Sequence, residues 1–113
     1  EVHKELGNGF LEAVYQEALG IEFSTRQIPY KPQFEIPIKY KNNSLNKSYR
    51  PDFIAYEKII IELKSSEMLT KVDEAQLFNY LKASGFSLGL LINFGNTKLE
   101  WIRRVLQVNK DPA

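Results

Sequence analysis

The chain has 113 residues, a formal net charge of +1, 43% hydrophobic residues and no cysteine. This composition indicates one small globular domain over residues 1–113 and excludes a disulfide framework, a disulfide-linked partner and a thiolate metal cluster. Since His3 is the single histidine, a multi-histidine zinc site within one chain is also excluded, and any metal must be bound mainly by oxygen.

The amino-terminal part predicts two helices separated by a glycine-rich turn. Residues 1–6 have the pattern of a helix, which we expect to begin before Glu1, and 7–9 (Gly-Asn-Gly) end it. Helical spacing of apolar residues returns over 10–23. No apolar run approaches the ~20 residues of a membrane span and no signal peptide opens the sequence, so we expect a cytoplasmic protein without a membrane partner.

Three strands are expected next. Alternation of apolar and polar residues over 33–41 predicts a half-buried strand, in which Pro37 favours an edge position. Turn residues at 42–44 lead into a second strand that we expect to continue to about Tyr56. The run 58–64 (Lys-Ile-Ile-Ile-Glu-Leu-Lys) is apolar on both faces at its start, which is typical of a central strand covered on both sides.

The last third predicts a helix followed by two strands. Thr70 and Asp73 have the spacing of an N-terminal capping box, and Gly85 lies where that helix should end. A buried strand is expected over 87–94, and 99–108 predicts a last strand or a short helix. The order α-β-β-β-α-β-β therefore predicts an α/β fold with a mixed sheet flanked by helices.

Two carboxylates are expected to face each other in the middle of the chain. If 56–58 forms a three-residue hairpin loop, the strand register places Asp52 opposite Glu62. Lys64 then shares that face of the strand. A two-residue loop would instead pair Asp52 with Leu63 and turn its side chain to the other face. Opposed like charges destabilise a sheet unless a cation lies between them, and Mg²⁺ needs neither cysteine nor histidine.

These residues resemble a known family. Residues 50–52 (Arg-Pro-Asp), nine intervening residues and 62–64 (Glu-Leu-Lys) resemble the PD-(D/E)XK nuclease superfamily, whose core has the order helix, three strands, helix, strand. Within it, 9–15 (Gly-Phe-Leu-Glu-Ala-Val-Tyr) match the motif of the small GxxExxY proteins. The resemblance implies a restriction-endonuclease-like core and a divalent-metal-dependent nuclease, a phosphodiester hydrolase acting on DNA or RNA.

The resemblance also implies roles for individual residues. Asp52 and Glu62 would ligate Mg²⁺ or Mn²⁺, with the backbone carbonyl of Leu63 as a further ligand. Lys64 would position the attacking water, and Glu12 corresponds to an acidic residue that the superfamily often brings toward the same metal. Two auxiliary residues on the helix after the active-site strand resemble a Gln-xxx-Tyr element. They are Gln76 and Tyr80.

The charge distribution is compatible with a nucleic-acid partner. The segment 39–50 has four basic residues and no acidic residue, and such a segment can bind backbone phosphates. They are Lys39, Lys41, Lys47 and Arg50. A solvated hairpin would have the same pattern. By analogy with small nucleases of the superfamily, a homodimer is also expected.

The alternative function is a catalytically silent nucleic-acid-binding or protein-interaction module on the same fold, because fold alone does not decide function. Without the resemblance, Glu62 and Lys64 would be ordinary charges at the end of a core strand, and Glu12 a solvated helix residue. The intact set of acidic and basic residues favours the enzyme, since opposed carboxylates without a catalytic role would only destabilise the sheet.

Overall fold

Three helices and seven strands make up residues 1–106, the part of the chain that the computed structural model describes. The helices are α1 (Val2–Leu6), α2 (Glu12–Thr25) and α3 (Lys71–Ser84). The strands are β1 (Tyr30–Pro32), β2 (Ile36–Tyr40), β3 (Asn43–Tyr49), β4 (Phe53–Ala55), β5 (Ile59–Lys64), β6 (Leu88–Asn93) and β7 (Glu100–Val105). Among these residues, none of the helices has the length and apolar character needed to cross a membrane.

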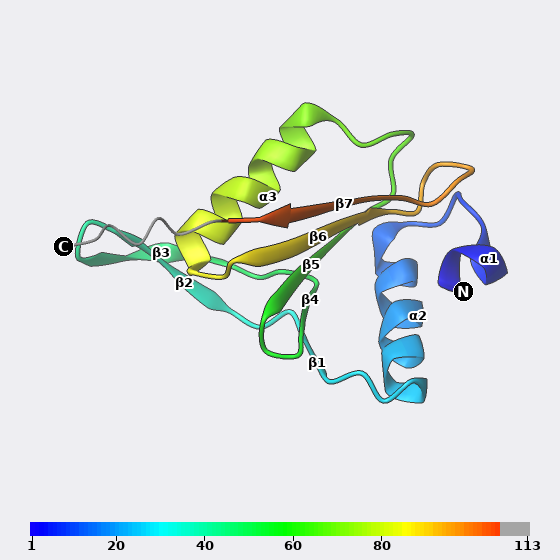
Figure 1. The fold of residues 1–113 in the computed structure, drawn as a ribbon, viewed down its shortest axis with the longest axis horizontal. Helices are drawn as coiled ribbons and strands as arrows, with labels where there is room; N and C mark the ends of the chain where they lie inside the picture. Colours follow the sequence, from blue (N-terminus) through cyan, green and yellow to red (C-terminus); the bar gives the residue numbers. More distant parts are fainter. Residues whose placement is uncertain (107–113) are drawn as a thin grey trace.

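The main sheet has five strands in the order β1-β4-β5-β6-β7. Strands β5 and β6 are parallel, and the other neighbours are antiparallel. Helices α1 and α2 pack on one face of the sheet and α3 packs on the other (Figure 1). The mixed sheet flanked by helices that the sequence predicts is therefore confirmed.

Strand β5 is the central strand and is covered on both faces. Ile61 and Leu63 pack with α2, whereas Ile60 packs with α3. All three side chains are at most 4% exposed. A strand buried on both faces reads as a continuous β-branched run, which is why the sequence predicts it correctly. Its carboxyl end is thus held firmly from both sides.

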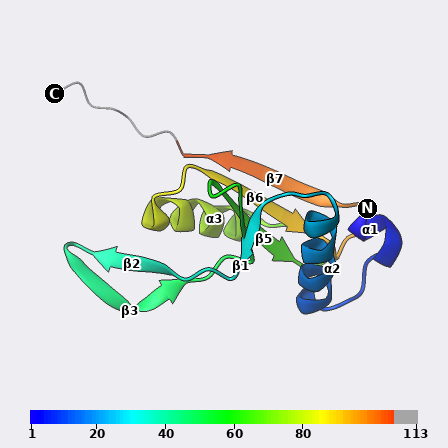
Figure 2. The same cartoon turned by 90° about the horizontal axis from the view of Figure 1, so that it is seen from below.

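The β2–β3 hairpin forms a separate two-stranded sheet and extends away from the main sheet (Figure 1 and Figure 2). Only its base is buried, where Ile36 lies opposite Tyr49. Toward its tip, Tyr40 is 62% exposed and Leu45 is 44% exposed. Both strands of a two-stranded sheet are edge strands. Pro37, which has no N–H to donate, therefore lies on an edge strand, as the sequence predicts.

The single long strand expected to end near Tyr56 is wrong. The chain leaves β3 at Tyr49 and enters β4 only at Phe53. Pro51 lies in the break, is buried, and has no N–H to continue a ladder. The strand expected from residue 33 also begins later, because Gln33 has a left-handed φ of 47° that ends the unpredicted short strand β1.

The expected ends of α3 are confirmed. Thr70 Oγ1 accepts a hydrogen bond from the Asp73 N–H at 3.2 Å, and Asp73 Oδ2 accepts one from the Thr70 N–H at 3.0 Å. Gly85 ends the helix with a left-handed φ of 79°. The segment from residue 99 forms strand β7 and not a short helix. The last two positions of its expected range, 107–108, lie outside the described residues.

Candidate functional site

Asp52 and Glu62, called the acidic pair below, lie at the open end of the β4–β5 hairpin. Ala55 lies opposite Ile59, so the loop between them has the three residues that the sequence predicts. The same register places Asp52 opposite Glu62. Side chains two positions apart share a face, and Ile60 packs against α3. The acidic pair therefore faces α3, and the geometrical part of the prediction is confirmed.

Each carboxylate of the acidic pair accepts a hydrogen bond from the backbone of the other strand. Glu62 Oε1 accepts from the Asp52 N–H at 3.1 Å, and Asp52 Oδ2 accepts from the Leu63 N–H at 2.7 Å. Within residues 1–106, no hydrogen bond or ion pair of standard geometry engages the second oxygen of either carboxylate. One oxygen of each group is therefore available to a further ligand.

The backbone carbonyl of Leu63 lies at the same end of the hairpin. Its N–H points to the β4 side, where it donates to Asp52. The C=O of a strand residue points to the same side as its N–H, so the Leu63 oxygen also faces β4. The register places Leu63 opposite Pro51, and proline has no N–H to donate to that oxygen. The Pro-Asp sequence thus leaves this carbonyl without its ladder bond from β4, beside the acidic pair.

Burial makes both carboxylates of the acidic pair reluctant to ionise. Burial, followed by the charge of Asp52, raises the pKa of Glu62 from 4.5 to about 7, although Lys64 opposes the shift. Burial also raises the pKa of Asp52, and the charge of Glu12 raises it further. The hydrogen bond from the Leu63 N–H and the charge of Lys64 lower it in part. A cation stabilises both charged forms. Two carboxylates and a carbonyl are oxygen donors that suit a hard ion, so the residues present fit Mg²⁺ or Mn²⁺.

Lys64 lines a crevice under α3 together with Glu62. Its Nζ lies 4.0 Å from Asp73 Oδ1. Gln76 and Tyr80 line the same crevice, and Gln76 Nε2 donates to Tyr80 Oη at 3.4 Å. The structure therefore brings both helix residues to the two charged residues of β5, as their position after the strand indicates.

Glu12 begins α2 and lies apart from the crevice. Its side chain is exposed and lines a groove of about 650 Å³ that Ser65, Ser66 and Gly95 also line. Its charge reaches Asp52, whose pKa it raises. Among residues 1–106, however, no group of three or more His, Cys, Asp or Glu side chains is gathered as a metal site. The structure thus places the acidic pair together and Glu12 within electrostatic range of it.

Lys39, Lys41 and Lys47 lie on the projecting β2–β3 hairpin, and Arg50 follows the end of β3. Lys39, Lys41 and Lys47 are exposed. Arg50 is different, because its Nη2 pairs with Glu35 Oε2 at 3.3 Å. The hairpin therefore presents three lysines to the solvent, whereas the charge of Arg50 is partly neutralised.

Sequence reasoning missed two polar residues near the site. Asn93 is fully buried and makes four hydrogen bonds, two with the backbone of Ser66, one with the Gly95 N–H and one with Glu100. A polar residue at the end of an apolar strand was a signal for it. Tyr49 is also buried, and no local sequence pattern around it predicts this burial.

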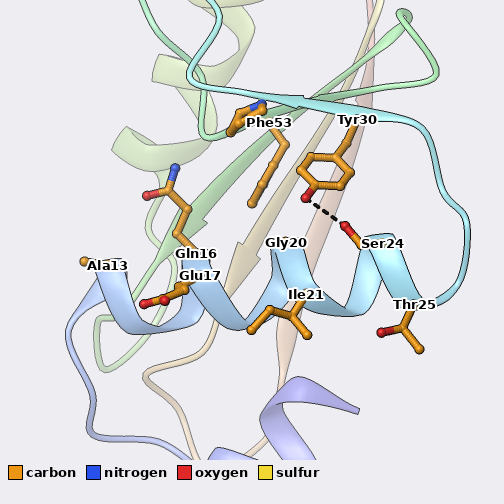
Figure 3. Close-up of a pocket in the computed structure, with 10 residues that line it drawn as sticks. Ala13, Gln16, Glu17, Gly20, Ile21, Ser24, Thr25, Tyr30 and Phe53 are labelled. Atoms are coloured by element: carbon orange, nitrogen blue, oxygen red, sulfur yellow. Dashed lines mark hydrogen bonds between the residues drawn. The ribbon is translucent and has the colours of Figure 1, made fainter.

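A second groove, of about 450 Å³, lies between α2 and β1, on the side of the sheet away from α3 (Figure 3). Figure 3 shows Tyr30 and Ser24 joined across it, with the two hydroxyl oxygens 3.0 Å apart. Of the residues that line it within the described part of the chain, only Glu17 carries a carboxylate. It therefore lacks the paired acids found under α3, and we do not assign it to the site.

A family model of the PD-(D/E)XK nuclease superfamily matches residues 1–105. The chain belongs to this superfamily. The solved structure titled "Crystal structure of SSO0001" is similar to this PD-(D/E)XK chain, with a TM-score of 0.68 and 17% identity over 87% of this chain and 52% of that one. That likeness shows the fold alone, and the PD-(D/E)XK chain spans about half of that relative's length. No curated protein matches the sequence.

Membership in the PD-(D/E)XK superfamily confirms the restriction-endonuclease-like core expected from the sequence. Nucleases of this superfamily generally use divalent metal ions. The residues that resemble the superfamily's motif in the sequence are the acidic pair, Leu63 and Lys64.

Proposed function

We propose that the chain is a divalent-metal-dependent phosphodiester hydrolase acting on DNA or RNA. The observation that carries this proposal is the acidic pair. Asp52 and Glu62 are opposed across one hairpin, both have raised pKa values, and each keeps one oxygen for another ligand. An uncompensated pair of this kind destabilises a sheet, and a functional site is the usual reason for such a pair.

In this proposal the acidic pair and the Leu63 carbonyl hold Mg²⁺ or Mn²⁺. A bound ion would polarise a phosphate oxygen and lower the pKa of a water molecule. Lys64 orients that water and offsets negative charge on the phosphoryl group. Its contact with Asp73, at 4.0 Å, is long enough for the ammonium to exchange this partner for a substrate. Gln76 and Tyr80, which line the same narrow crevice from α3, are the auxiliary residues of the proposal.

Glu12 is the further acid in the proposal, and the GxxExxY motif explains its position. Gly9 has a φ of 119°, which favours glycine. The Tyr15 hydroxyl donates to the Gly7 carbonyl at 2.6 Å and accepts from the Phe10 N–H at 3.2 Å. These contacts fix the turn that precedes α2. They support assignment to the GxxExxY proteins, with the tyrosine as a structural residue and the glutamate as the one that faces solvent.

The β2–β3 hairpin supports a nucleic-acid substrate. Its three exposed lysines can bind phosphates without reading sequence. Tyr40 is 62% exposed, and Lys41 Nζ lies 5.6 Å from the centre of its ring. An exposed aromatic ring beside a cation can stack on an unpaired base. The hairpin therefore offers both backbone and base contacts.

Replacing Lys39, Lys41 and Lys47 together with alanine should weaken nucleic-acid binding by at least about 10-fold. The slope of log K against log salt should also become shallower, by about 2 to 3 units, since about one counterion is released per phosphate contact. Fluorescence anisotropy over a salt series measures both effects. A matched control replaces three exposed lysines elsewhere, Lys4, Lys71 and Lys98. If the two triple variants bind alike, the hairpin does not belong to the binding surface.

A catalytically silent module is the second candidate, and one observation favours it. Lys64 is paired with Asp73, and both acidic side chains accept hydrogen bonds from backbone N–H groups. These contacts would also satisfy the charges in a protein that binds nucleic acid without cutting it.

Cleavage assays in a Mn²⁺ or Mg²⁺ titration decide between the two candidates, using single-stranded, duplex and branched substrates of DNA and RNA. The wild type should cleave at least one substrate only with metal. Asp52→Asn should lose metal binding and cleavage, whereas Lys64→Ala should bind metal but cleave at least about 100-fold more slowly. The control is Lys58→Ala, at an exposed lysine of the loop. Cleavage that survives both substitutions contradicts the assignment, and binding without cleavage by the wild type favours the silent module.

Two coarser expectations complete the proposal. Trp101 and Val105 of the outer strand β7 are 63% and 44% exposed, and within residues 1–106 the outer edge of β7 pairs with no further strand. A strand edge with exposed apolar side chains supports a homodimer. A cytoplasmic location accords with a nucleic-acid substrate.

A further inference from the structure

A buried hydroxyl group lies beside the acidic pair without a hydrogen-bond partner. Tyr49, the last residue of β3, is 4% exposed, and among the described residues its Oη has no partner. Buried hydroxyl groups are normally paired, because leaving one without a partner costs folding free energy. An orphan of this kind calls for a ligand or a functional reason.

The ring of Tyr49 is held rigidly. It stacks on the ring of Tyr80, with centroids 3.9 Å apart and an interplanar angle of 5°. It also belongs to the core cluster with Ile54 and Ile60. Its hydroxyl therefore cannot turn to solvent and stays on the α3 side of the sheet, the side that the acidic pair faces.

The hydroxyl lies in the electrostatic field of the acidic pair. Burial raises the pKa of Tyr49 above its ordinary value of 10, and the charges of Glu62 and Asp52 raise it further. A phenol has its proton at neutral pH, so toward a carboxylate the Tyr49 hydroxyl is a donor. Its proximity lowers the pKa of Glu62, yet the geometry falls short of a formed hydrogen bond. Tyr80, on which the Tyr49 ring stacks, lines the crevice together with Glu62, so the hydroxyl lies beside that crevice.

We propose that Tyr49 is a positioning residue for Glu62, donating a hydrogen bond to its carboxylate when that carboxylate binds a divalent ion. This inference rests on the proposed function. A carboxylate that ligates a metal is oriented by hydrogen-bond donors around it. The Asp52 N–H is one such donor to Glu62, and the Tyr49 hydroxyl would be the second. Tyr49 is a preformed donor on a rigid ring, and neither the superfamily motif nor the Gln-xxx-Tyr element includes it.

The test replaces Tyr49 with phenylalanine, which removes only the hydroxyl and keeps the stacked ring. Titration calorimetry with Mn²⁺ should show affinity about 10-fold weaker than in the wild type. The melting temperature of the metal-free protein should stay the same or rise, because a hydroxyl without a partner is removed. Tyr40→Phe, at an exposed tyrosine of the same hairpin, is the matched control and should change neither quantity.

A spectroscopic readout separates positioning from packing. Adding Mg²⁺ to the wild type should change the near-ultraviolet absorbance of tyrosine, and this difference should be absent from Tyr49→Phe. Equal Mn²⁺ affinity in the variant and the wild type would overturn the inference and leave the proposed function intact. A fall in affinity with an equal loss of metal-free stability would also overturn it. No Mn²⁺ binding by the wild type would overturn both proposals.

Discussion

Replacing Glu62 with glutamine should abolish hydrolysis and, at the same time, stabilise the metal-free protein above neutral pH. The loss of activity should be at least about 100-fold, because a group that stabilises charge at the reacting centre is removed. The gain in stability follows from the pKa of Glu62, which burial and Asp52 raise from 4.5 to about 7. The same substitution therefore separates the effect of Glu62 on folding stability from its effect on hydrolysis.

The pH window follows from the direction of this shift. A carboxyl group whose pKa is higher in the folded than in the unfolded protein stabilises the fold. This stabilisation is complete when the pH is below the pKa of the unfolded state, and it is lost as the pH rises through the pKa of the folded state. For Glu62 the loss falls between 4.5 and about 7. A glutamine does not ionise and has no such loss. The free energy of unfolding of the variant should therefore exceed that of the wild type by on the order of 2 kcal/mol at pH 8.

Urea denaturation in the presence of a chelator, at pH 5 and pH 8, measures the gain. The control is Glu57→Gln, at an exposed residue of the same hairpin, which should change neither stability nor activity. Saturating Mg²⁺ should reverse the order and make the wild type the more stable protein, since only its site binds the ion. A variant that is no more stable than the wild type at pH 8 without metal would refute the electrostatic account.

Replacing Asn93 with alanine should cost about 3 to 5 kcal/mol of folding free energy. Its side chain accepts from the N–H groups of Ser66 and Gly95 and donates to the Ser66 carbonyl and to Glu100. Alanine leaves these partly buried groups without their partner, and each such loss costs about 1 to 3 kcal/mol. The described backbone has little room to adjust, because a Cβ on Gly95 would lie 2.3 Å from the Ser66 oxygen.

Urea denaturation of the wild type and Asn93→Ala measures this loss. Asn79→Ala, at an exposed position of α3, is the control and should stay within about 0.5 kcal/mol of the wild type. Since Ser66 follows the strand that carries Glu62 and Lys64, cleavage should also fall. A loss of stability below about 1 kcal/mol would show that the asparagine does not hold the two strand ends together.

The hairpin that carries the acidic pair was predictable because its geometry is local. A three-residue loop fixes the register, and the register alone decides which side chains face each other. The same holds for α3, whose ends depend on Thr70, Asp73 and Gly85 within one sequence segment. Where structure is decided by neighbours in the chain, pattern and chemistry are enough.

The rest depends on contacts between distant segments. Tyr49 is buried because the base of its hairpin packs on α3 and on Tyr80, and no local pattern shows that contact. Pro51 lies within the strand that the sequence predicts to continue to about Tyr56, yet its effect is to interrupt that strand and leave the Leu63 carbonyl beside the acidic pair. Glu12 reaches the site only through the way α2 packs on the sheet. These features are set by tertiary packing and not by periodicity.

The ion-binding oxygens proposed here all come from one short stretch, Asp52 to Leu63, and the neighbouring ammonium follows immediately. Closing so short a loop costs little entropy, so we expect this chemistry to assemble early in folding, before distant segments dock. We expect the helices to pack around a hairpin that is already in place.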